Sequence, residues 1–525
     1  MKENYKMKKI ISLFGVLIVS FSPELFAATY YMPDDFPNLQ TCFSNMAGGD
    51  TLIIRDGTYT GTANMITNSV RPPAGSSSTW TVIKAEHDGE VFFDGQDTLN
   101  MFNYTGSGNG LYWQFEGIIW GNTPASNVAF SSAGFLKFFR CGAFDPGTGN
   151  TINFLAGRYS FDALFENCYA WGGGRYKFSG YQADRIIFRA CVARHDVING
   201  WSGSHGEPAG SFSMYSVDDG EVQNCIAVDS DQTDAYLNIT SYAGAFCVPC
   251  TDMDANRVNY VRCVALNTRL GGMSASRQNY DARNVTFTDC VLWDTATSTA
   301  SSINIWRGTE SRTLNCTFGN GIHDYYSHNS YDCCGENNTT LKNSIIYNYR
   351  GGTIFYDVEN EDYNCLYDND GQNQSGEHDI TNINPIWNGQ ANPAGALKYI
   401  IRIESGSNLK GVGENGASIG ATAVKMVGKP GTLWGEQDYN GEQSTGMWPF
   451  PNEALIKRKM QAYSGTMNGV SVSGARGFAA AGTGLYGGPI TLTSYIWERL
   501  GNPLPAEIYG ADTIPPENPG NLQVK

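Results

Sequence analysis

Positive charge is scarce in this sequence of 525 residues. It has 35 lysine and arginine residues against 51 aspartate and glutamate residues, a formal net charge of −16 at pH 7. Lys177 is the only lysine between Lys137 and Lys342. Because nucleic-acid phosphates are bound by clusters of lysine and arginine, this balance argues against nucleic acid as a partner. An acidic surface can instead hold Ca²⁺, whose ligands are oxygens.

Several functional motifs are also missing. The sequence has no Cys-x-x-Cys-His haem motif, no phosphate-binding loop and no Gly-x-Ser-x-Gly elbow. The pairs Cys247/Cys250 and Cys333/Cys334 lack histidines at the spacing of zinc ligands, so local disulfides or surface thiols are expected there. Beyond the N-terminus no apolar run reaches the length of about 18 residues that a membrane span requires.

The N-terminus has the pattern of a bacterial signal peptide. Two lysines at positions 8 and 9 precede an apolar run over residues 10–20, and Leu25-Phe26-Ala27-Ala28 offers a cleavage site. The apolar run is too short to span a membrane. We therefore predict a signal peptide over residues 1–27 and a soluble, monomeric mature protein that is secreted or held in the periplasm or at the cell surface.

One short pattern recurs between residues 165 and 294: a β-favouring run, a polar residue, Cys, and then a small or branched apolar residue. It occurs at Phe165-Glu166-Asn167-Cys168-Tyr169-Ala170, Phe188-Arg189-Ala190-Cys191-Val192-Ala193, Val222-Gln223-Asn224-Cys225-Ile226-Ala227, Val261-Arg262-Cys263-Val264-Ala265 and Phe287-Thr288-Asp289-Cys290-Val291-Leu292. Weaker copies stand at Cys141, Cys316, Ser344 and Cys365.

This repeat predicts a stacked all-β solenoid. The copies are irregularly spaced, so the variation lies in loops, whereas leucine-rich or helical repeats keep a fixed period. Apolar and polar residues alternate at period two, as in strands with one buried face. The polar residue before Cys suits a left-handed corner, above all where it is Asn. We expect about ten to twelve coils with the cysteines in one inward column.

Thirteen cysteines in an exported protein raise the question of disulfides. Most of them occupy the repeated inward position, where Cys behaves as a small hydrophobe, which favours a stack of buried thiols. Bridging between coils stays open as an alternative, because equivalent positions are only about 4.8 Å apart.

The pattern resembles the right-handed parallel β-helix of the pectate lyase superfamily, in which asparagine-rich corners stack coil upon coil. The resemblance covers residues 29–424. It implies an all-β, right-handed parallel β-helix, but that superfamily includes lyases, hydrolases, esterases, adhesins and phage proteins, so no single activity follows from it.

Four segments follow from this interpretation. Residues 1–27 are the signal peptide, and residues 28–425 form the β-helix, beginning with a capping helix that Leu39, Cys42, Phe43 and Met46 predict by their spacing. Residues 426–511 form a C-terminal cap or tail with two short helices, whose predicted N-caps are Asn452 and Thr491. Residues 512–525 are a proline-rich linker that ends in a segment similar to the first strand of a fibronectin type III domain.

Charged residues follow the same corner in successive copies. Equivalent positions of adjacent coils lie about 4.8 Å apart, so these residues are expected to form one polar strip. The strip holds Arg175 and Lys177 after Cys168, and Arg194, His195 and Asp196 after Cys191. It continues with Asp229, Asp231 and Asp234 after Cys225, and with Arg269 after Cys263. In lyases of the resembled superfamily, the substrate groove lies along the strand that follows this loop.

Within residues 175–178, alternation turns Arg175 and Lys177 outward. A lysine among arginines has a lowered pKa, which a base at neutral pH requires. This arrangement is similar to that of acidic-polysaccharide lyases, where Ca²⁺ or arginine neutralises a uronate carboxylate and lysine or arginine removes the acidified proton. The resemblance implies catalytic roles for Lys177, Arg194, Arg175 and His195. A solvated, salt-bridged surface is the alternative interpretation.

The metal and substrate ligands are predicted in the same region. Two or more carboxylates in one loop suit a hard cation, so Asp229, Asp231 and Asp234 are the candidate ligands of Ca²⁺. Sugar rings stack on aromatic planes, and the predicted substrate contacts are Trp171, Tyr215, Trp201, Arg269 and Trp306.

Three functions fit these observations. The first is a lyase that cleaves an acidic, uronate-containing polysaccharide by β-elimination. The second is a non-catalytic surface, adhesion or glycan-binding protein, with a polysaccharide or cell-surface glycan as partner in either case. The third is a glycoside hydrolase that uses paired carboxylates such as Asp196 and Asp229.

Overall fold

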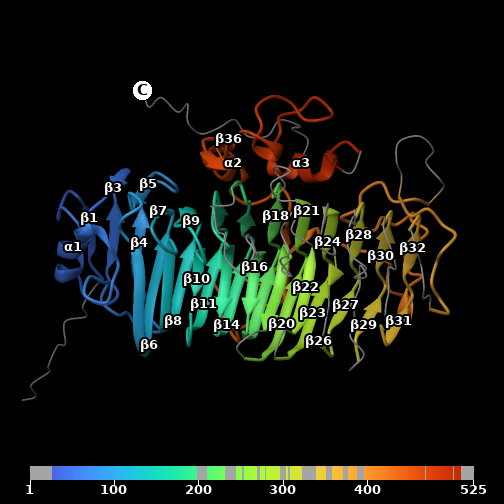
Figure 1. Ribbon diagram of the computed structural model, residues 1–525, viewed down its shortest axis with the longest axis horizontal. Helices are drawn as coiled ribbons and strands as arrows, with labels where there is room; N and C mark the ends of the chain where they lie inside the picture. The colour runs from blue at the N-terminus through green and yellow to red at the C-terminus, as the bar shows by residue number, and fades with distance from the viewer. Residues whose placement is uncertain are drawn as a thin grey trace, which may run out of the picture.

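The chain is a right-handed parallel β-helix (Figure 1). The computed structural model describes residues 27–197, 210–230, 244–250, 253–268, 272–277, 280–295, 303–304, 308–321, 338–349, 358–369, 376–386, 395–467, 469–499 and 502–509. The predicted signal peptide, up to residue 26, and the predicted linker at 512–525 lie outside these residues. The fold predicted from the repeat is confirmed.

Each central coil has three strands, which stack into three faces. The first face consists of β10 (Ile152–Ala156), β13 (Tyr176–Tyr181), β16 (Gly210–Tyr215), β19 (Phe246–Cys250), β22 (Met273–Arg277) and β25 (Ile303–Asn304). The second consists of β11 (Phe161–Glu166), β14 (Asp184–Arg189), β17 (Asp218–Gln223), β20 (Ala255–Val261), β23 (Ala282–Thr288), β26 (Gly308–Thr309), β27 (Arg312–Leu314), β29 (Thr340–Lys342) and β31 (Asn360–Asp362). Long strands in the preceding coils join these two faces into one sheet.

The third face is a separate 12-stranded sheet that follows the cysteine corner. Its strands are β3 (Gly57–Tyr59), β5 (Val91–Asp94), β7 (Ile118–Thr123), β9 (Gly142–Pro146), β12 (Tyr169–Trp171), β15 (Val192–Ala193), β18 (Ile226–Val228), β21 (Val264–Thr268), β24 (Val291–Thr295), β28 (Thr317–Gly319), β30 (Ile345–Tyr347) and β32 (Cys365–Tyr367). Twelve rungs agree with the coil number that the sequence predicted.

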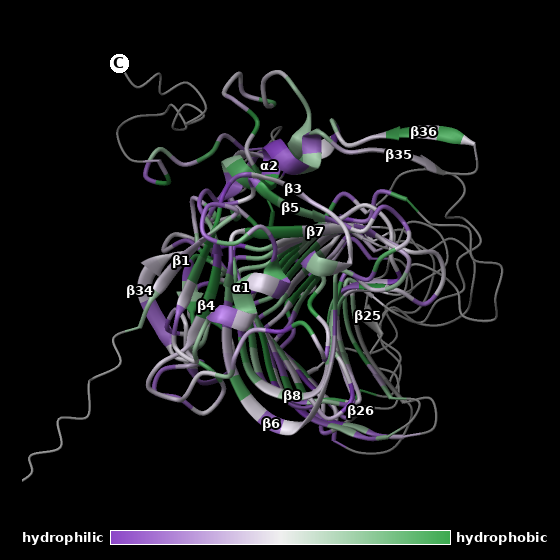
Figure 2. Cartoon of the chain, turned by 90° about the vertical axis from the view of Figure 1, so that its left-hand side faces the viewer, coloured by the Kyte–Doolittle hydropathy of each residue, from purple (hydrophilic) through white to green (hydrophobic). Residues whose placement is uncertain are grey.

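The N-terminal coils are closed by the predicted cap. The strands there are β1 (Thr29–Met32), β2 (Thr51–Ile54), β4 (Thr81–Ala85), β6 (Phe102–Glu116) and β8 (Val128–Phe139), and helix α1 (Leu39–Asn45) lies across their open end (Figure 2). Asn38 caps α1 by accepting a hydrogen bond from the Thr41 N–H at 3.0 Å. Leu39, Cys42 and Phe43 are buried. The helix therefore covers apolar residues that the first coil would otherwise expose.

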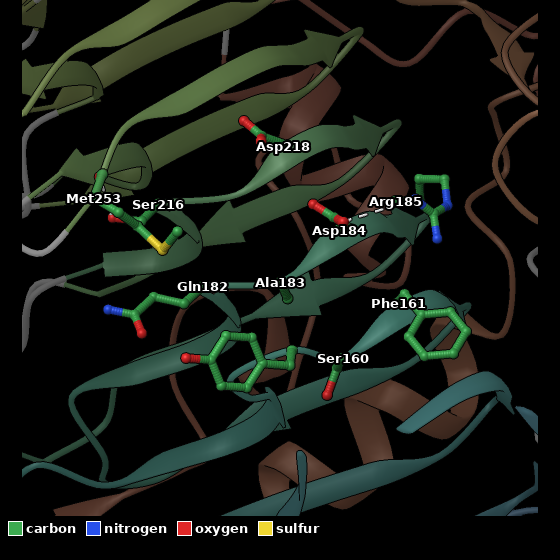
Figure 3. Close-up of a pocket in the computed structure, with 10 residues that line it drawn as sticks. Ser160, Phe161, Gln182, Ala183, Asp184, Arg185, Ser216, Asp218 and Met253 are labelled. Atoms are coloured by element: carbon green, nitrogen blue, oxygen red, sulfur yellow. Dashed lines mark hydrogen bonds and ion pairs between the residues drawn. The ribbon is translucent and has the colours of Figure 1, made fainter. Parts of the chain in front are cut away.

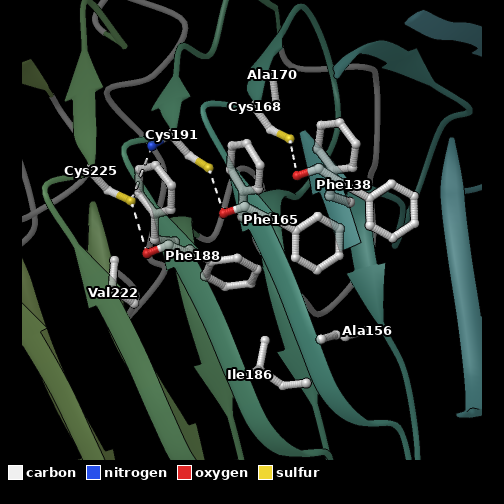
Figure 4. Close-up of a cluster of buried hydrophobic side chains, with 14 of the residues drawn as sticks. Phe138, Ala156, Phe165, Cys168, Ala170, Ile186, Phe188, Cys191, Val222 and Cys225 are labelled. Carbon is white, nitrogen blue, oxygen red and sulfur yellow. Dashed lines mark hydrogen bonds between the residues drawn. The ribbon is translucent and has the colours of Figure 1, made fainter. Parts of the chain in front are cut away.

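The cysteines form a column of buried free thiols. Each Sγ lies against a backbone carbonyl of the preceding coil: Cys168 against Phe138, Cys191 against Phe165 and Cys225 against Phe188, at 3.3–3.4 Å (Figure 4). Burial raises the pKa of these thiols. The thiol interpretation is thus confirmed for the described cysteines of the column. Cys247 and Cys250 are also buried free thiols, so the local disulfide or surface thiols expected there are wrong, and Cys333 and Cys334 lie outside the described residues.

The corner before this column has left-handed backbone in every coil, as predicted. Asn167, Ala190 and Asn224 have φ of 50–56°. One member of the predicted column is wrong, however. Cys365 pairs with Ile345 on the outer side of the third face, and Asn364 occupies the inward position instead. The amide of Asn364 donates to the Leu341 carbonyl at 3.1 Å, so it replaces the thiol contact with a stronger hydrogen bond.

The buried column gives a stability prediction. Cys225→Asp should lower the free energy of unfolding by about 4 kcal/mol, because it places an unpaired carboxylate in an apolar stack. Cys225→Ala should cost about 1 kcal/mol, since it removes only a small sulfur side chain. Urea denaturation of both variants measures the difference, and equally mild effects would show that the position tolerates charge and is not part of the core.

Much of the C-terminal segment, residues 395–509, lies along the third face (Figure 1), while Leu433 packs on the outer side of the second face, against Leu164 and Ile187. Its elements are β33 (Lys425–Val427), β34 (Glu442–Gly446), α2 (Glu453–Gln461), β35 (Ser464–Met467), β36 (Val470–Ser473) and α3 (Leu492–Glu498). Outward residues of the third face, including Val192, Ile226 and Val264, pack against Phe478, Ile496 and Trp497 of the segment. The third face is therefore buried on both sides.

Both predicted C-terminal helices are present. Thr491 caps α3 in a capping box with Ser494, as its sequence suggests. Asn452 is the N-cap residue of α2, as predicted, but its φ is 57° and its side chain makes no capping hydrogen bond. No helix in the described part of the chain has the length and apolar character needed to cross a membrane.

Candidate functional site

Lys177 in β13 is completely buried, whereas alternation predicted an exposed side chain. Its Nζ donates hydrogen bonds to the carbonyl oxygens of Trp171 at 3.2 Å, Gly172 at 2.8 Å and Gly173. Burial lowers the pKa of Lys177 to about 7, while Asp196 and Asp145 oppose this shift. All three ammonium protons are engaged by backbone, so the prediction of an exposed base is wrong. This lysine fixes the turn after β12.

Arg194 and Asp196 are also buried, because the C-terminal segment covers them. The Arg194 guanidinium is 3.0 Å from Asp196 and donates to the carbonyls of Met460 and Gly474. Arg476 of the segment adds an ion pair with Asp196 at 2.8 Å. The predicted open strip is here the contact between the β-helix and its C-terminal segment, so its charges bind protein and face no solvent.

The two remaining predicted catalytic residues, His195 and Arg175, differ in their exposure to solvent. His195 is buried, and its Nε2 is 3.2 Å from the carbonyl oxygen of Gly210, to which it donates. Burial and the nearby Lys177 hold the pKa of His195 well below its ordinary value. Arg175 is partly exposed, with its guanidinium 3.0 Å from Asn150 Oδ1 and over the ring of Tyr176. Arg175 alone of the four keeps contact with solvent.

Buried His195 predicts acid instability. Below about pH 6.5 the unfolded chain binds a proton at this histidine and the native chain does not, so the free energy of unfolding falls with pH by up to about 1.4 kcal/mol per unit. His195→Gln keeps a donor for Gly210 and cannot titrate, and it should flatten this slope in urea denaturation between pH 7 and pH 5. An unchanged slope would mean that His195 binds its proton over the same pH range in the native and the unfolded chain.

The predicted metal ligand Asp229 does not fit a cation. Its Oδ1 accepts hydrogen bonds from Asn267 Nδ2 at 2.8 Å and from the Tyr495 hydroxyl at 2.7 Å, and its Oδ2 accepts from the Phe478 N–H at 3.0 Å. The carboxylate thus anchors the C-terminal segment at a corner of the β-helix. Asp231 and Asp234 lie outside the described residues.

A second set of possible metal ligands is exposed near the N-terminal end. Ligand atoms of Asp56, Glu86 and His87 lie within 4.8 Å of one another. His87 Nδ1 is 2.9 Å from Asp56, and Glu86 pairs with Arg55, so these groups already have partners. Nothing else at this place points to an ion.

Of the predicted substrate contacts, Trp171 is buried against the C-terminal segment and stacks on Phe144 at 4.8 Å, so it is not available to a ligand. Tyr215 is partly exposed at the end of β16, 5.0 Å from the ring of Tyr181. Trp201, Arg269 and Trp306 lie outside the described residues.

An open groove begins next to Tyr215, at the corner between the first and second faces (Figure 3). We call it the corner groove. Its volume is about 470 Å³, and it is lined by Tyr159, Ser160, Phe161, Gln182, Ala183, Asp184, Arg185, Ser216, Asp218 and Met253. Phe161, Asp184 and Asp218 are equivalent positions of three successive coils. The groove therefore presents a lining that repeats along the solenoid axis.

The groove combines apolar rings with charge. Tyr159 is 70% exposed, and Arg158 lies over the ring of the neighbouring Tyr181 at 5.6 Å. Both nitrogens of the Arg185 fork bond the carboxylate of Asp162 at 2.8 and 3.2 Å. Such a rim can stack on the face of a sugar ring and bond its hydroxyls.

Two carboxylates of the groove lie side by side. Asp184 and Asp218 begin adjacent parallel strands in register, so their backbones are about 4.8 Å apart. Burial raises the pKa of both, and the charge of Asp184 raises that of Asp218 further. Arg185 offsets part of this effect at Asp184, from 3.7 Å. Figure 3 shows both carboxylates at the same end of the groove as Arg185.

No protein-family model and no curated protein matches the sequence. Solved structures with a similar fold include an alginate lyase from Paenibacillus sp. strain FPU-7, with a TM-score of 0.34 and 12% identity over 62% of this chain and 98% of its own. The PL6 family alginate lyase AlyGC gives 0.39 and 10% over 68% of this chain and 53% of its own. Pectate lyase Pel9A gives 0.35 and 15% over 73% and 88%. Likeness at this level concerns the coiled architecture alone.

Proposed function

We propose that this protein is a carbohydrate-active β-helix that binds an extended polysaccharide in the corner groove. The observation that supports this is the repeated lining, in which Phe161, Asp184 and Asp218 follow one another from coil to coil. A ligand that repeats along its own axis suits a surface that repeats along the solenoid. Exposed Tyr159 offers an apolar ring for stacking, and the charged side chains offer hydrogen bonds.

We favour binding over β-elimination because most of the predicted lyase residues are not accessible to a substrate. Lys177 and Arg194 are buried and fully engaged, so neither can remove a proton from a uronate. A uronate-containing polysaccharide remains one class of ligand to test, with exposed Arg158, next to Tyr159 of the groove, as a nearby cation. Export through the predicted signal peptide would bring the protein to such polymers.

Hydrolysis is the second candidate function. Asp184 and Asp218 are carboxylates with raised pKa values at equivalent positions of neighbouring coils. Two carboxyl groups about 5 Å apart that flank a glycosidic bond can serve as acid and nucleophile in a retaining glycosidase. The pair that the sequence suggested, Asp196 and Asp229, is buried under the C-terminal segment and is not available for this role.

The binding proposal is tested with Tyr159→Ala. Because the ring is mostly exposed, the variant should melt at the wild-type temperature but bind a polysaccharide about tenfold more weakly in affinity electrophoresis against alginate, polygalacturonate and neutral glucans. Tyr486→Ala, which removes another exposed ring from the C-terminal segment, away from the groove, is the matched control. Equal affinity for wild type and Tyr159→Ala would place the polysaccharide elsewhere.

Cleavage is followed in the same samples, with and without Ca²⁺. New reducing ends that disappear in Asp184→Asn and in Asp218→Asn would support hydrolysis in the corner groove. Absorbance from a new C=C bond would indicate β-elimination, and binding without either signal would indicate a glycan-binding protein.

A further inference from the structure

The last coil of the β-helix departs from the apolar pattern of the others. In β31, Glu361 pairs with Leu341 of β29, and the preceding coils hold Thr313 and Phe287 at this inward position. Glu361 is only 8% exposed. A carboxyl group thus points into the interior at the C-terminal end of the solenoid, where burial of an unpaired charge is costly.

Only half of this carboxyl group is satisfied. Glu361 Oε1 accepts a hydrogen bond from Asn364 Nδ2 at 2.8 Å. Glu361 Oε2 is buried and has no hydrogen-bond partner among the described residues. The amide of Asn364 cannot turn to supply a second bond, because its Oδ1 accepts from the Ser344 N–H and its Nδ2 also donates to the Leu341 carbonyl.

A second carboxylate is fixed beside it. Asp379 contacts Glu361, and its two oxygens accept hydrogen bonds from the backbone N–H groups of Asn364 at 2.6 Å and Gly376 at 2.8 Å. Burial and the proximity of Asp379 raise the pKa of Glu361 to about 8. Two carboxyl groups in contact are balanced either by a shared proton or by a bound positive charge.

The neighbouring charged groups do not supply that charge. His378 is bonded to Asp362 at 2.8 Å, and Lys342 is paired with Glu414 at 2.6 Å. Within the described parts of the chain, no lysine or arginine pairs with Glu361 or Asp379.

We propose that Glu361 and Asp379 bind a divalent cation, with Ca²⁺ as the ion that best fits two carboxylates and a solvent-facing side. Ca²⁺ takes only oxygen ligands and tolerates an irregular shell that water completes, which partly exposed Asp379 allows. The ion would tie residues 376–386 to the last coil, where Ile380 already accepts from the Leu366 N–H and donates to the Asn364 carbonyl. It would therefore close the C-terminal end of the core, a role separate from the corner groove.

The test uses the full-length protein after removal of metals with EDTA. Saturating Ca²⁺ should raise the melting temperature by at least about 3 °C, and equilibrium dialysis should show a bound Ca²⁺ that Glu361→Gln and Asp379→Asn each remove. Glu377→Gln, next to the site but exposed, should bind Ca²⁺ as the wild type does. Each substitution replaces a carboxylate with an amide of nearly the same shape.

Two results would overturn the proposal. One is a wild-type protein whose melting temperature and dialysis show no response to Ca²⁺, which would mean that the two carboxyl groups share a proton. The other is a Ca²⁺ response that persists in both Glu361→Gln and Asp379→Asn, which would place the ion elsewhere.

Discussion

Trp497→Ala is expected to lower the free energy of unfolding of the whole protein by about 3–5 kcal/mol. Trp497 of α3 is completely buried. Its ring packs edge-on against Trp448 and Tyr399, with centroids at 6.1 and 5.1 Å, and the guanidinium of Arg402 lies over it at 5.5 Å. Because this cluster is continuous with the outward side of the third face, its loss should weaken the β-helix as well as the C-terminal segment.

The measurement is urea denaturation followed by two probes, tryptophan fluorescence and far-ultraviolet circular dichroism. Tyr486→Ala, in the same segment but 46% exposed, is the control and should change the free energy of unfolding by less than about 0.5 kcal/mol. An early separate transition in Trp497→Ala, with the β-helix transition unmoved, would show that the segment folds independently and contradict a shared core.

The repeat predicted the coils well because its signals are local. A left-handed corner, an inward Cys and alternating strands are each set by a few adjacent residues, and Asn167 and Asn224 adopt the expected backbone. The same reasoning was wrong at Cys365, where the motif is shifted by one residue. A shift of one position moves a strand residue to the opposite side, so an isolated Cys cannot fix the register of its coil.

The site was harder to predict because exposure depends on segments distant in sequence. Alternation predicted an exposed Lys177, but nothing in residues 175–178 indicates that residues 460–479 cover the neighbouring strip. The apolar residues after each Cys, such as Val192 and Ile226, carried a signal, since a third face apolar on both sides must have a cover.

The corner groove also had a signal in the sequence. Tyr181 and Tyr215 each stand three residues before an aspartate, Asp184 and Asp218, at equivalent places of adjacent coils. Alignment on Cys drew attention to the opposite corner, where the charged residues are more numerous. Many charged residues in one corner of a solenoid are therefore weaker evidence for a site than a charged residue that recurs from coil to coil beside aromatic rings.

Lys177→Ala is expected to destabilise the protein by about 3–5 kcal/mol, because the residue is completely buried and hydrogen-bonded. The substitution leaves the carbonyls of Trp171, Gly172 and Gly173 without their shared donor. It also removes the positive charge that faces Asp145 and Asp196. Asp145 bonds the Tyr463 hydroxyl at 3.0 Å and Asp196 bonds Arg476, so the loss should extend to the docking of the C-terminal segment.

Thermal melts compare Lys177→Ala with Lys177→Met, which restores volume without charge, and with Lys398→Ala at an exposed position. If the ammonium group carries the effect, Lys177→Met should remain nearly as unstable as Lys177→Ala, while Lys398→Ala should melt with the wild type. A stable Lys177→Met would mean that packing matters and charge does not. If Lys177→Met instead kept wild-type stability but lost polysaccharide cleavage, this lysine would be the base of a lyase. Its three backbone hydrogen bonds would then have to open in the native state.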